Sequence, residues 1–103
     1  MSFSVRYTRV AREDLLRLYE YLLDRATTPE DIDLASQALD AITASIGNLE
    51  HAPFLYRKAG VSAFVRELLI PFGASGYVAL YEIDDATTVT ILALRHQLED
   101  DYH

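Results

Sequence analysis

Residues 64–97 read FVRELLIPFGASGYVALYEIDDATTVTILALRHQ, and this stretch decides the fold class. Apolar side chains alternate with other residues along much of it, which is the period of two expected of a half-buried strand. Two short segments rich in Gly, Ala and Asp, residues 73–76 and 84–87, interrupt the pattern and predict turns. The stretch therefore predicts an antiparallel meander of three strands: residues 64–72, 77–83 and 88–95.

Two helices are predicted upstream of the meander. Thr8 can cap the first, and its apolar residues recur every three or four positions: Ala11, Leu15, Leu18, Leu22 and Ala26. Thr28 can cap the second, and Pro29 occupies its first position. Its apolar residues keep the same spacing as far as a stop at residues 51–53: Ala35, Leu39, Ile42, Ile46 and Leu49. Because the connection between the helices is short, we expect an antiparallel helical hairpin.

The remaining segments complete the predicted order of elements. Phe3, Val5 and Tyr7 alternate with polar residues and predict a first strand, whereas residues 54–62 are predicted to be a loop. The order is thus β-α-α-β-β-β. We expect an α+β fold in which a helical hairpin packs on one face of a small, mostly antiparallel sheet. A length of 103 residues suits one domain, residues 1–103.

Composition argues against several classes of protein. Sixteen acidic and nine basic residues give a net charge of −7, which repels phosphate backbones, so direct nucleic-acid binding is not expected. A local cluster of Arg57, Lys58 and Arg66 would be the exception, and most of the acidic residues serve solubility. The chain has no cysteine, which excludes disulfides and thiolate zinc sites. No apolar run could span a membrane, and early arginines break up any secretory signal, so we expect a cytoplasmic protein.

The first predicted helix carries a second apolar stripe beside its core-facing one. Leu16, Tyr19 and Leu23 follow each other at spacings of three and four residues. A helix that packs only on a sheet usually leaves that side polar. Two interpretations stay open: the second helix covers the stripe inside the hairpin, or part of the stripe is exposed and binds a partner.

Arg66 is the second candidate functional residue. It has the same strand parity as Phe64 and Leu68, where a core would prefer Val or Ile. A buried arginine needs a compensating partner, and a salt bridge to Glu82 or Glu99 is one interpretation. The alternative is a cation held on a rigid strand to meet an anion.

The last predicted strand ends in polar residues, among them Arg95, His96 and Gln97. A single histidine at a strand end is more often a hydrogen-bonded structural residue than a catalyst. The spacing of His51, His96 and His103 matches no metal motif, so we expect no metal and no cofactor. The chain has no glycine-rich phosphate loop, no nucleophile elbow and no clear pair of carboxylates for acid–base catalysis.

Taken in order, four segments resemble the ParE/RelE superfamily of bacterial type II toxins: AREDL (11–15), RELLIPFG (66–73), SGYVALY (75–81) and ILALRHQ (91–97). The resemblance covers essentially the whole chain. It implies a toxin–antitoxin (plasmid stabilisation) toxin that is neutralised by a small antitoxin with a DNA-binding part, which we expect to be of the ribbon-helix-helix, ParD-like kind. In this superfamily the RelE branch cleaves messenger RNA on the ribosome, whereas the ParE branch poisons DNA gyrase and has no established catalytic activity.

The resemblance also suggests site residues. For a RelE-like nuclease the catalytic set would be Arg66, Arg95, His96 and Tyr102. For a ParE-like toxin the target-binding residues would be Arg66, Arg95, His96 and Gln97, and the antitoxin-binding residues would be Leu16, Tyr19 and Leu23.

One departure from the family pattern bears on the choice of branch. Relatives commonly have an arginine at or near position 98, where this chain has Leu98 followed by three acidic residues. RNA cleavage needs cations around the scissile phosphate, so this exchange favours the ParE branch. Three hypotheses follow: a gyrase inhibitor, a ribosome-dependent endonuclease, and a toxin-fold protein that has lost its toxicity but still binds a partner.

Overall fold

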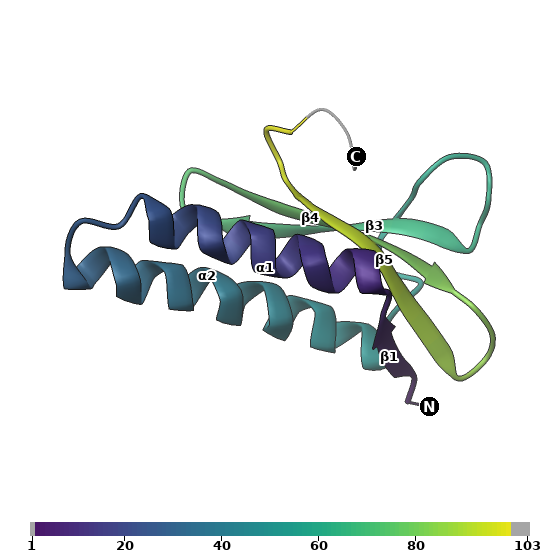
Figure 1. The fold of residues 1–103 in the computed structure, drawn as a ribbon. Coiled ribbons are helices and arrows are strands. Elements are labelled where there is room, and N and C mark those ends of the chain that lie inside the picture. The colour runs from purple at the N-terminus through teal and green to yellow at the C-terminus, as the bar shows by residue number, and fades with distance from the viewer. Residues whose placement is uncertain (1, 100–103) are drawn as a thin grey trace.

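Within residues 2–99, which the computed structural model describes, two helices lie side by side across one face of a five-stranded sheet (Figure 1). The helices are α1 (Arg9–Asp24) and α2 (Pro29–Gly47), and a short 3-10 turn, η1 (Asn48–Glu50), follows them. The strands are β1 (Ser4–Tyr7), β2 (Arg57–Lys58), β3 (Val65–Phe72), β4 (Ser75–Ile83) and β5 (Thr88–His96). Their order across the sheet is β1-β5-β4-β3-β2. β1 runs parallel to β5 and the other neighbours are antiparallel, which confirms the predicted α+β architecture.

Both helices begin where the sequence predicts. The hydroxyl of Thr8 accepts a hydrogen bond from the N–H of Ala11 at 3.0 Å, and the hydroxyl of Thr28 accepts one from Asp31 at 3.2 Å. Each bond satisfies a backbone donor that the first helical turn leaves without a partner. Pro29 stands at the first position of α2, as predicted. No helix within residues 2–99 is both long and apolar enough to cross a membrane.

Two strands differ from the prediction by more than one residue, whereas β3 begins one residue later and β5 ends one residue later than predicted. The predicted loop of residues 54–62 contains β2, in which Arg57 and Lys58 pair with Glu67 and Arg66. β4 begins at Ser75 rather than Tyr77, because Gly76 enters the strand with a φ of 151°. An added Cβ at Gly76 would press into the backbone carbonyl of Ile70, so only glycine fits this close approach.

The core lies between the helices and the sheet. α1 and α2 contribute Ala11, Leu18, Ala38, Ile42 and Ile46, and the facing side of the sheet contributes Leu68, Ile70, Tyr77, Ala79, Tyr81, Ile83, Val89, Ile91 and Leu94. Tyr81 is fully buried and its hydroxyl donates to the carbonyl of Pro53 at 2.5 Å. Burial raises the pKa of Tyr81 to about 12, and the positive charge of Arg66 opposes this rise only in part. This hydrogen bond ties the segment after η1 to the middle of the sheet.

A single buried acidic side chain on α1 completes the edge of β5. β1 pairs only with the first half of β5, as far as Ile91. Beyond that point the Oδ2 atom of Asp14, a residue only 3% exposed, accepts a hydrogen bond from the N–H of Leu94 at 2.9 Å. The hydroxyl of Thr8 donates to the carbonyl of Leu92 at 3.0 Å. Side chains of α1 and its cap therefore replace the strand that the sheet lacks there.

Candidate functional site

Arg66 lies on the face of the sheet that the helices cover, because it pairs with the core residue Tyr81. Its guanidinium donates to three backbone carbonyls: Ala63 at 2.9 Å, Phe54 at 3.1 Å and Tyr56 at 2.7 Å. It also lies over the ring of Phe54, 5.4 Å from the centroid. The predicted salt bridge to Glu82 or Glu99 is therefore wrong. Carbonyl oxygens of the neighbouring loop satisfy the guanidinium instead, and Arg66 staples that loop to β3.

Arg95 lies on the opposite face of the sheet. It pairs with Val78, which in turn pairs with Leu69, on the side away from the helices. Its Nη1 donates to the carbonyl of Glu99 at 2.8 Å and more weakly to those of His96 and Gln97, both at 3.3 Å. Its Nη2 lies 3.9 Å from a carboxylate oxygen of Glu67. Arg95 thus folds back on the chain that follows β5 and holds it in a turn.

Glu67 links this turn to the edge of the sheet. Its Oε1 lies 3.0 Å from Nη2 of Arg57 in β2. The carboxylate therefore stands between two guanidinium groups, those of Arg57 and Arg95. This network of two ion pairs helps to fix the side chains of Arg57 and Arg95, because both guanidinium groups face the same carboxylate.

His96 lies on the helix-covered face, opposite Tyr77. Its Nδ1 accepts a hydrogen bond from the N–H of Leu98 at 3.1 Å, so the neutral ring carries its proton on Nε2. That Nε2 lies 3.1 Å from the hydroxyl of Ser75. The ring of Tyr77 meets the imidazole edge-on, with centroids 5.4 Å apart, and burial raises the pKa of Tyr77. Both ring nitrogens of His96 are therefore engaged within the protein.

Glu99 joins the end of β5 to α1. One carboxylate oxygen accepts from the N–H of His96 at 2.9 Å and from Nη1 of Arg17 at 3.2 Å. Arg17 also reaches the carbonyl of Leu94 at 3.4 Å and lies 3.8 Å from the carboxylate of Asp14. These contacts hold the segment after β5 against the helix.

A hollow of about 530 Å³ lies beside these contacts, between α1 and the end of β5. We call it the C-terminal pocket, and its lining is Arg17, Leu18, Tyr21, Leu22, Tyr77, His96, Leu98 and Glu99. Leu98 is 79% exposed at the rim of this pocket. The backbone N–H of Gln97 donates a hydrogen bond to the carbonyl of Gly76 at 2.9 Å. Apolar walls with a few fixed polar groups suit the binding of a side chain from another protein.

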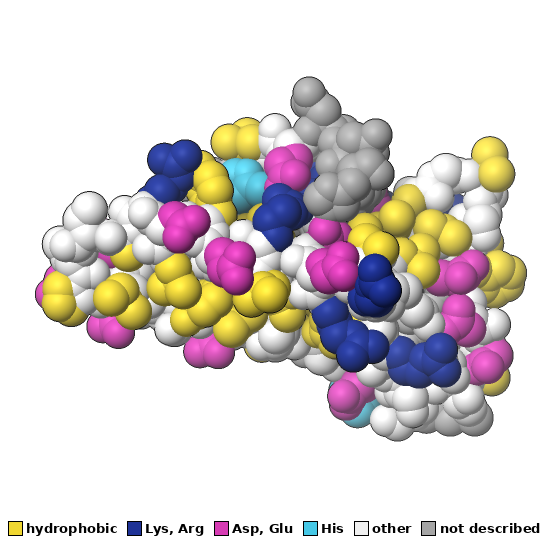
Figure 2. Space-filling model, in the orientation of Figure 1, with side chains coloured by type: hydrophobic (Ala, Val, Ile, Leu, Met, Phe, Trp, Pro, Cys, Tyr) yellow, Lys and Arg dark blue, Asp and Glu magenta, His cyan; other side chains and the backbone are white. Residues whose placement is uncertain are grey.

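Part of the second apolar stripe of α1 is covered inside the helical hairpin, and part of it is exposed at the surface. Tyr19 is half-buried in the seam between the helices, where it borders the same narrow gap as Leu39. Leu16 is 56% exposed and Leu23 is half-buried. Figure 2 shows hydrophobic side chains gathered in a band along the hairpin, with acidic side chains on its margins. The hairpin therefore covers part of the stripe and leaves an apolar band at its surface.

The predicted site residues are only partly brought together. Of the residues predicted for target binding or catalysis, only His96 lines the C-terminal pocket. Arg95 and Gln97 lie next to it in the chain, whereas Arg66 lies on the other side of the sheet from Arg95. Tyr102 lies outside the described residues. Within residues 2–99, no three His, Cys, Asp or Glu side chains are grouped so that they could hold a metal ion.

Sequence reasoning missed Asp14, Arg17 and Glu67 as members of this network. Asp14 carried a usable signal, since it stands three residues after Ala11 and four before Leu18, on the core face of α1. An acidic residue among core positions predicts a buried acceptor that needs a donor.

Comparison with known proteins agrees with this architecture. The family model described as "ParE toxin of type II toxin-antitoxin system, parDE" matches residues 5–101. A curated relative, "Toxin RelE3" of Caulobacter vibrioides, is 40% identical over 91 residues, which cover 86% of this chain and 88% of the relative. "Toxin RelE1" of the same bacterium is 31% identical over 99 residues, covering 96% and 98%.

A solved structure shares the fold. A chain of the chromosomal ParDE toxin–antitoxin system from P. aeruginosa superimposes with a TM-score of 0.72 over 92% of this chain and 96% of its own, at 18% identity. The family model and the two curated toxins span nearly the whole sequence. The chain therefore belongs to the ParE toxin family of type II toxin–antitoxin systems.

Proposed function

We propose that this toxin inhibits DNA gyrase through protein–protein contact and does not cleave RNA. The observation that supports this most is the separation of the two strand arginines. Arg66 and Arg95 lie on opposite faces of the sheet. Backbone carbonyls accept hydrogen bonds from both guanidinium groups, and the carboxylate of Glu67 also lies beside that of Arg95. A ribonuclease needs cations that converge on one phosphate, because charge develops there in the transition state.

The C-terminal pocket is the proposed contact site for gyrase. His96 and Leu98 line it, while Arg95 and Gln97 hold the chain that forms its wall. An exposed leucine beside aromatic rings suits contact with a protein side chain better than contact with a phosphate. This proposal places the toxin in the cytoplasm, where gyrase and ribosomes both act, and involves no direct contact with nucleic acid.

A gyrase assay with purified components tests the proposal. Saturating toxin should stop the supercoiling of relaxed plasmid and trap cleaved DNA in a gyrase complex. Leu98→Asp should weaken inhibition at least tenfold. Leu34→Asp is the matched control without effect, because Leu34 is an exposed leucine of α2 that does not line the pocket. Normal supercoiling at saturating toxin would reject gyrase as the target.

Ribosome-dependent cleavage of messenger RNA is the second candidate. Two relatives named as RelE toxins, at 40% and 31% identity, favour it. Toxin induction followed by primer extension on ribosome-bound messages would reveal codon-specific cuts. Such cuts, together with unaffected gyrase, would establish this candidate in place of the first.

Loss of toxicity is the third candidate, and the apolar residue at position 98 is its motivation. Induction of the toxin without its antitoxin separates it from the other two, since growth arrest requires an active toxin. Normal growth with folded toxin at high level would identify a binding protein that has kept only the fold.

We also propose that the cognate antitoxin, small and DNA-binding with a ribbon-helix-helix part, docks on the apolar band of the hairpin at Leu16, Tyr19 and Leu23. The exposed side chain of Leu16 and the half-buried ones of Tyr19 and Leu23 offer apolar area beside acidic margins. An antitoxin segment that folds as it docks would bury this area at an entropic cost.

Charge substitution in the stripe tests the docking site. Leu16→Asp and Leu23→Asp should weaken the complex with the antitoxin, encoded beside the toxin gene, at least a hundredfold, with unchanged helix content by circular dichroism. Tyr19→Asp should do the same at a greater cost in stability, because Tyr19 also packs against α2. Val10→Asp is the control: Val10 is 48% exposed on α1 but lies about 120° around the helix from Leu16. Equal affinity of all variants would reject this surface.

A further inference from the structure

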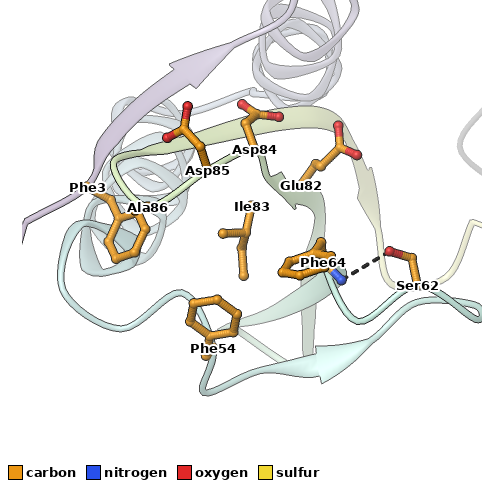
Figure 3. Close-up of a pocket in the computed structure, with 9 residues that line it drawn as sticks. All are labelled: Phe3, Phe54, Ser62, Phe64, Glu82, Ile83, Asp84, Asp85 and Ala86. Carbon is orange, nitrogen blue, oxygen red and sulfur yellow. Dashed lines mark hydrogen bonds between the residues drawn. The ribbon is translucent and has the colours of Figure 1, made fainter.

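An aromatic hollow lies at the end of the sheet where β1 begins and β4 ends, and it shares no lining residue with the C-terminal pocket. Its volume is about 750 Å³. Figure 3 shows the rings of Phe3, Phe54 and Phe64 set around the side chain of Ile83. Phe54 and Phe64 belong to the segment between η1 and β3, whereas Phe3 precedes β1, and the fold brings the three rings together at the surface. We call this hollow the phenylalanine pocket.

The rings of the phenylalanine pocket are unusually exposed. Phe54 and Phe64 are 52% and 54% exposed, although nothing in the chain obliges a loop to present large aromatic rings to water. Leu55 and Val61, close to them along the same loop, are 75% and fully exposed. An apolar surface of this kind on a small protein marks a place of contact with another molecule.

The loop that carries these residues is held in place. Arg66 donates to the carbonyls of Phe54 and Tyr56 on one side and to Ala63 on the other. The hydroxyl of Ser62 accepts from the N–H of Phe64 at 3.1 Å, as the dashed line in Figure 3 marks. The rings are therefore preorganised, which lowers the entropic cost of binding.

The rim of the phenylalanine pocket is acidic. Glu82, Asp84 and Asp85 lie along one side of it, with carboxylates that Figure 3 shows directed away from the rings, and no Lys or Arg of residues 2–99 lines the hollow. Hydrogen bonds from the backbone and hydroxyl of Thr87 lower the pKa of Asp85, so this carboxylate is ionised at neutral pH. The rim therefore repels phosphates and anionic lipid, and also opposes a second copy of this chain with its net charge of −7.

We propose that the phenylalanine pocket binds a segment of a partner protein that inserts an aromatic or large aliphatic side chain between the rings and places a flanking Lys or Arg on the carboxylate rim. Charge complementarity selects the basic residue, and the rings select the apolar one. The exposed Leu55 and Val61 extend the apolar surface along the loop, which suits an extended peptide better than a small molecule. This inference holds whichever cellular target the toxin has.

Short synthetic peptides test the proposal on the intact toxin by NMR titration. The probes are acetyl-Lys-Phe-Lys-amide, its acidic counterpart acetyl-Glu-Phe-Glu-amide, and acetyl-Lys-Ala-Lys-amide. The basic aromatic peptide should shift the resonances of Phe3, Phe54, Phe64 and Ile83 in a saturable way. The other two should bind at least tenfold more weakly. Raising the salt from 50 to 500 mM should weaken binding of the basic aromatic peptide severalfold.

Variants locate the site. Phe64→Ser should weaken binding of the basic aromatic peptide at least tenfold, and Glu82→Gln about threefold. Leu69→Ser, at a residue 45% exposed outside the pocket, should leave it unchanged. If Phe64→Ser disturbs the folded spectrum, Phe54→Ser replaces it. Equal binding of the acidic peptide, an unchanged affinity in the pocket variants, or the absence of saturable shifts at millimolar peptide would each overturn the proposal.

Discussion

The carboxylate of Asp14 in α1 accepts a hydrogen bond from the backbone N–H of Leu94 in β5, with 2.9 Å between oxygen and nitrogen. The two residues are 80 positions apart, and the bond spans the junction between helix and sheet. Because β1 has already ended at this level, the N–H of Leu94 would otherwise be buried without an acceptor. A helix side chain thus finishes the hydrogen bonding of a strand edge.

Removal of this acceptor should destabilise the fold. Asp14→Ala leaves the buried N–H of Leu94 without a partner and should lower the free energy of unfolding by about 1–3 kcal/mol. Asp14→Asn keeps a carbonyl acceptor and should lose less. Urea denaturation followed by circular dichroism measures both. Glu13→Ala is the neighbouring control, since its ion pair with Arg9 is exposed, and its effect should stay within about 0.5 kcal/mol.

Two glycines should respond to alanine in opposite directions. Gly76→Ala forces a Cβ into the carbonyl of Ile70 at a positive φ and should cost about 2–4 kcal/mol. Gly47, at the end of α2, has helical angles and no atom within 4 Å of a Cβ position, so Gly47→Ala should gain about 0.5–1 kcal/mol. Thermal unfolding of the two variants compares them directly. A Gly76→Ala protein as stable as the parent would contradict the close approach of β3 and β4.

The buried hydroxyl of Tyr81 should make the protein sensitive to alkali. The pKa of Tyr81 is about 12 in the folded protein and near 10 in the unfolded chain. The contribution of this group to the free energy of unfolding is therefore fully present below pH 10. Between pH 10 and 12 the unfolded chain releases a proton that the folded protein retains, and stability should fall by about 1.4 kcal/mol per pH unit. Tyr81→Phe should unfold more easily at pH 7 but show a shallower loss above pH 10. Identical slopes for both proteins in urea titrations would contradict this account.

The staple formed by Arg66 should be visible in the loop before β3. Arg66→Lys keeps the charge but cannot reach carbonyls on both sides of the loop, so it should resemble Arg66→Ala. In both variants the amides of Arg57, Lys58 and Ala59 should exchange with solvent at least about tenfold faster. Arg9→Ala, whose side chain is 90% exposed, is the control. Full rescue by lysine would show that charge alone, rather than the guanidinium geometry, is required.

Much of the fold was predictable from local patterns. The hairpin, both capping threonines and the three long strands follow from signals within a few residues of each element. β2 was missed because its two residues form a strand only through pairing with Glu67 and Arg66, which no local period reveals. The early start of β4 depends on the extended backbone of Gly76. A glycine in the sequence indicates a turn as readily as a strand, so this start could not be predicted.

The candidate site was less predictable, and a β-bulge explains why. Leu80 pairs with Ala93 and Tyr81 with Ile91, so Leu92 is an extra residue in β5. This residue reverses the side-chain alternation and sends Arg95 to the face away from Arg66. Strict alternation from Ile91 would have put both arginines on the same face. The role of Arg66 was equally hidden, because the carbonyl oxygens that it binds belong to residues of any type.

The parallel pairing of β1 with β5 has a consequence for the life of the toxin in the cell. Ser4 stands beside Thr88, so β1 acquires its sheet neighbour only after both helices and the other strands have been synthesised. A product that ends before β5 would lack the strand with which β1 pairs and to which Asp14 of α1 is hydrogen-bonded. Chains that stop before β5 should therefore be inactive fragments, and toxic protein should arise only once β5 has been synthesised.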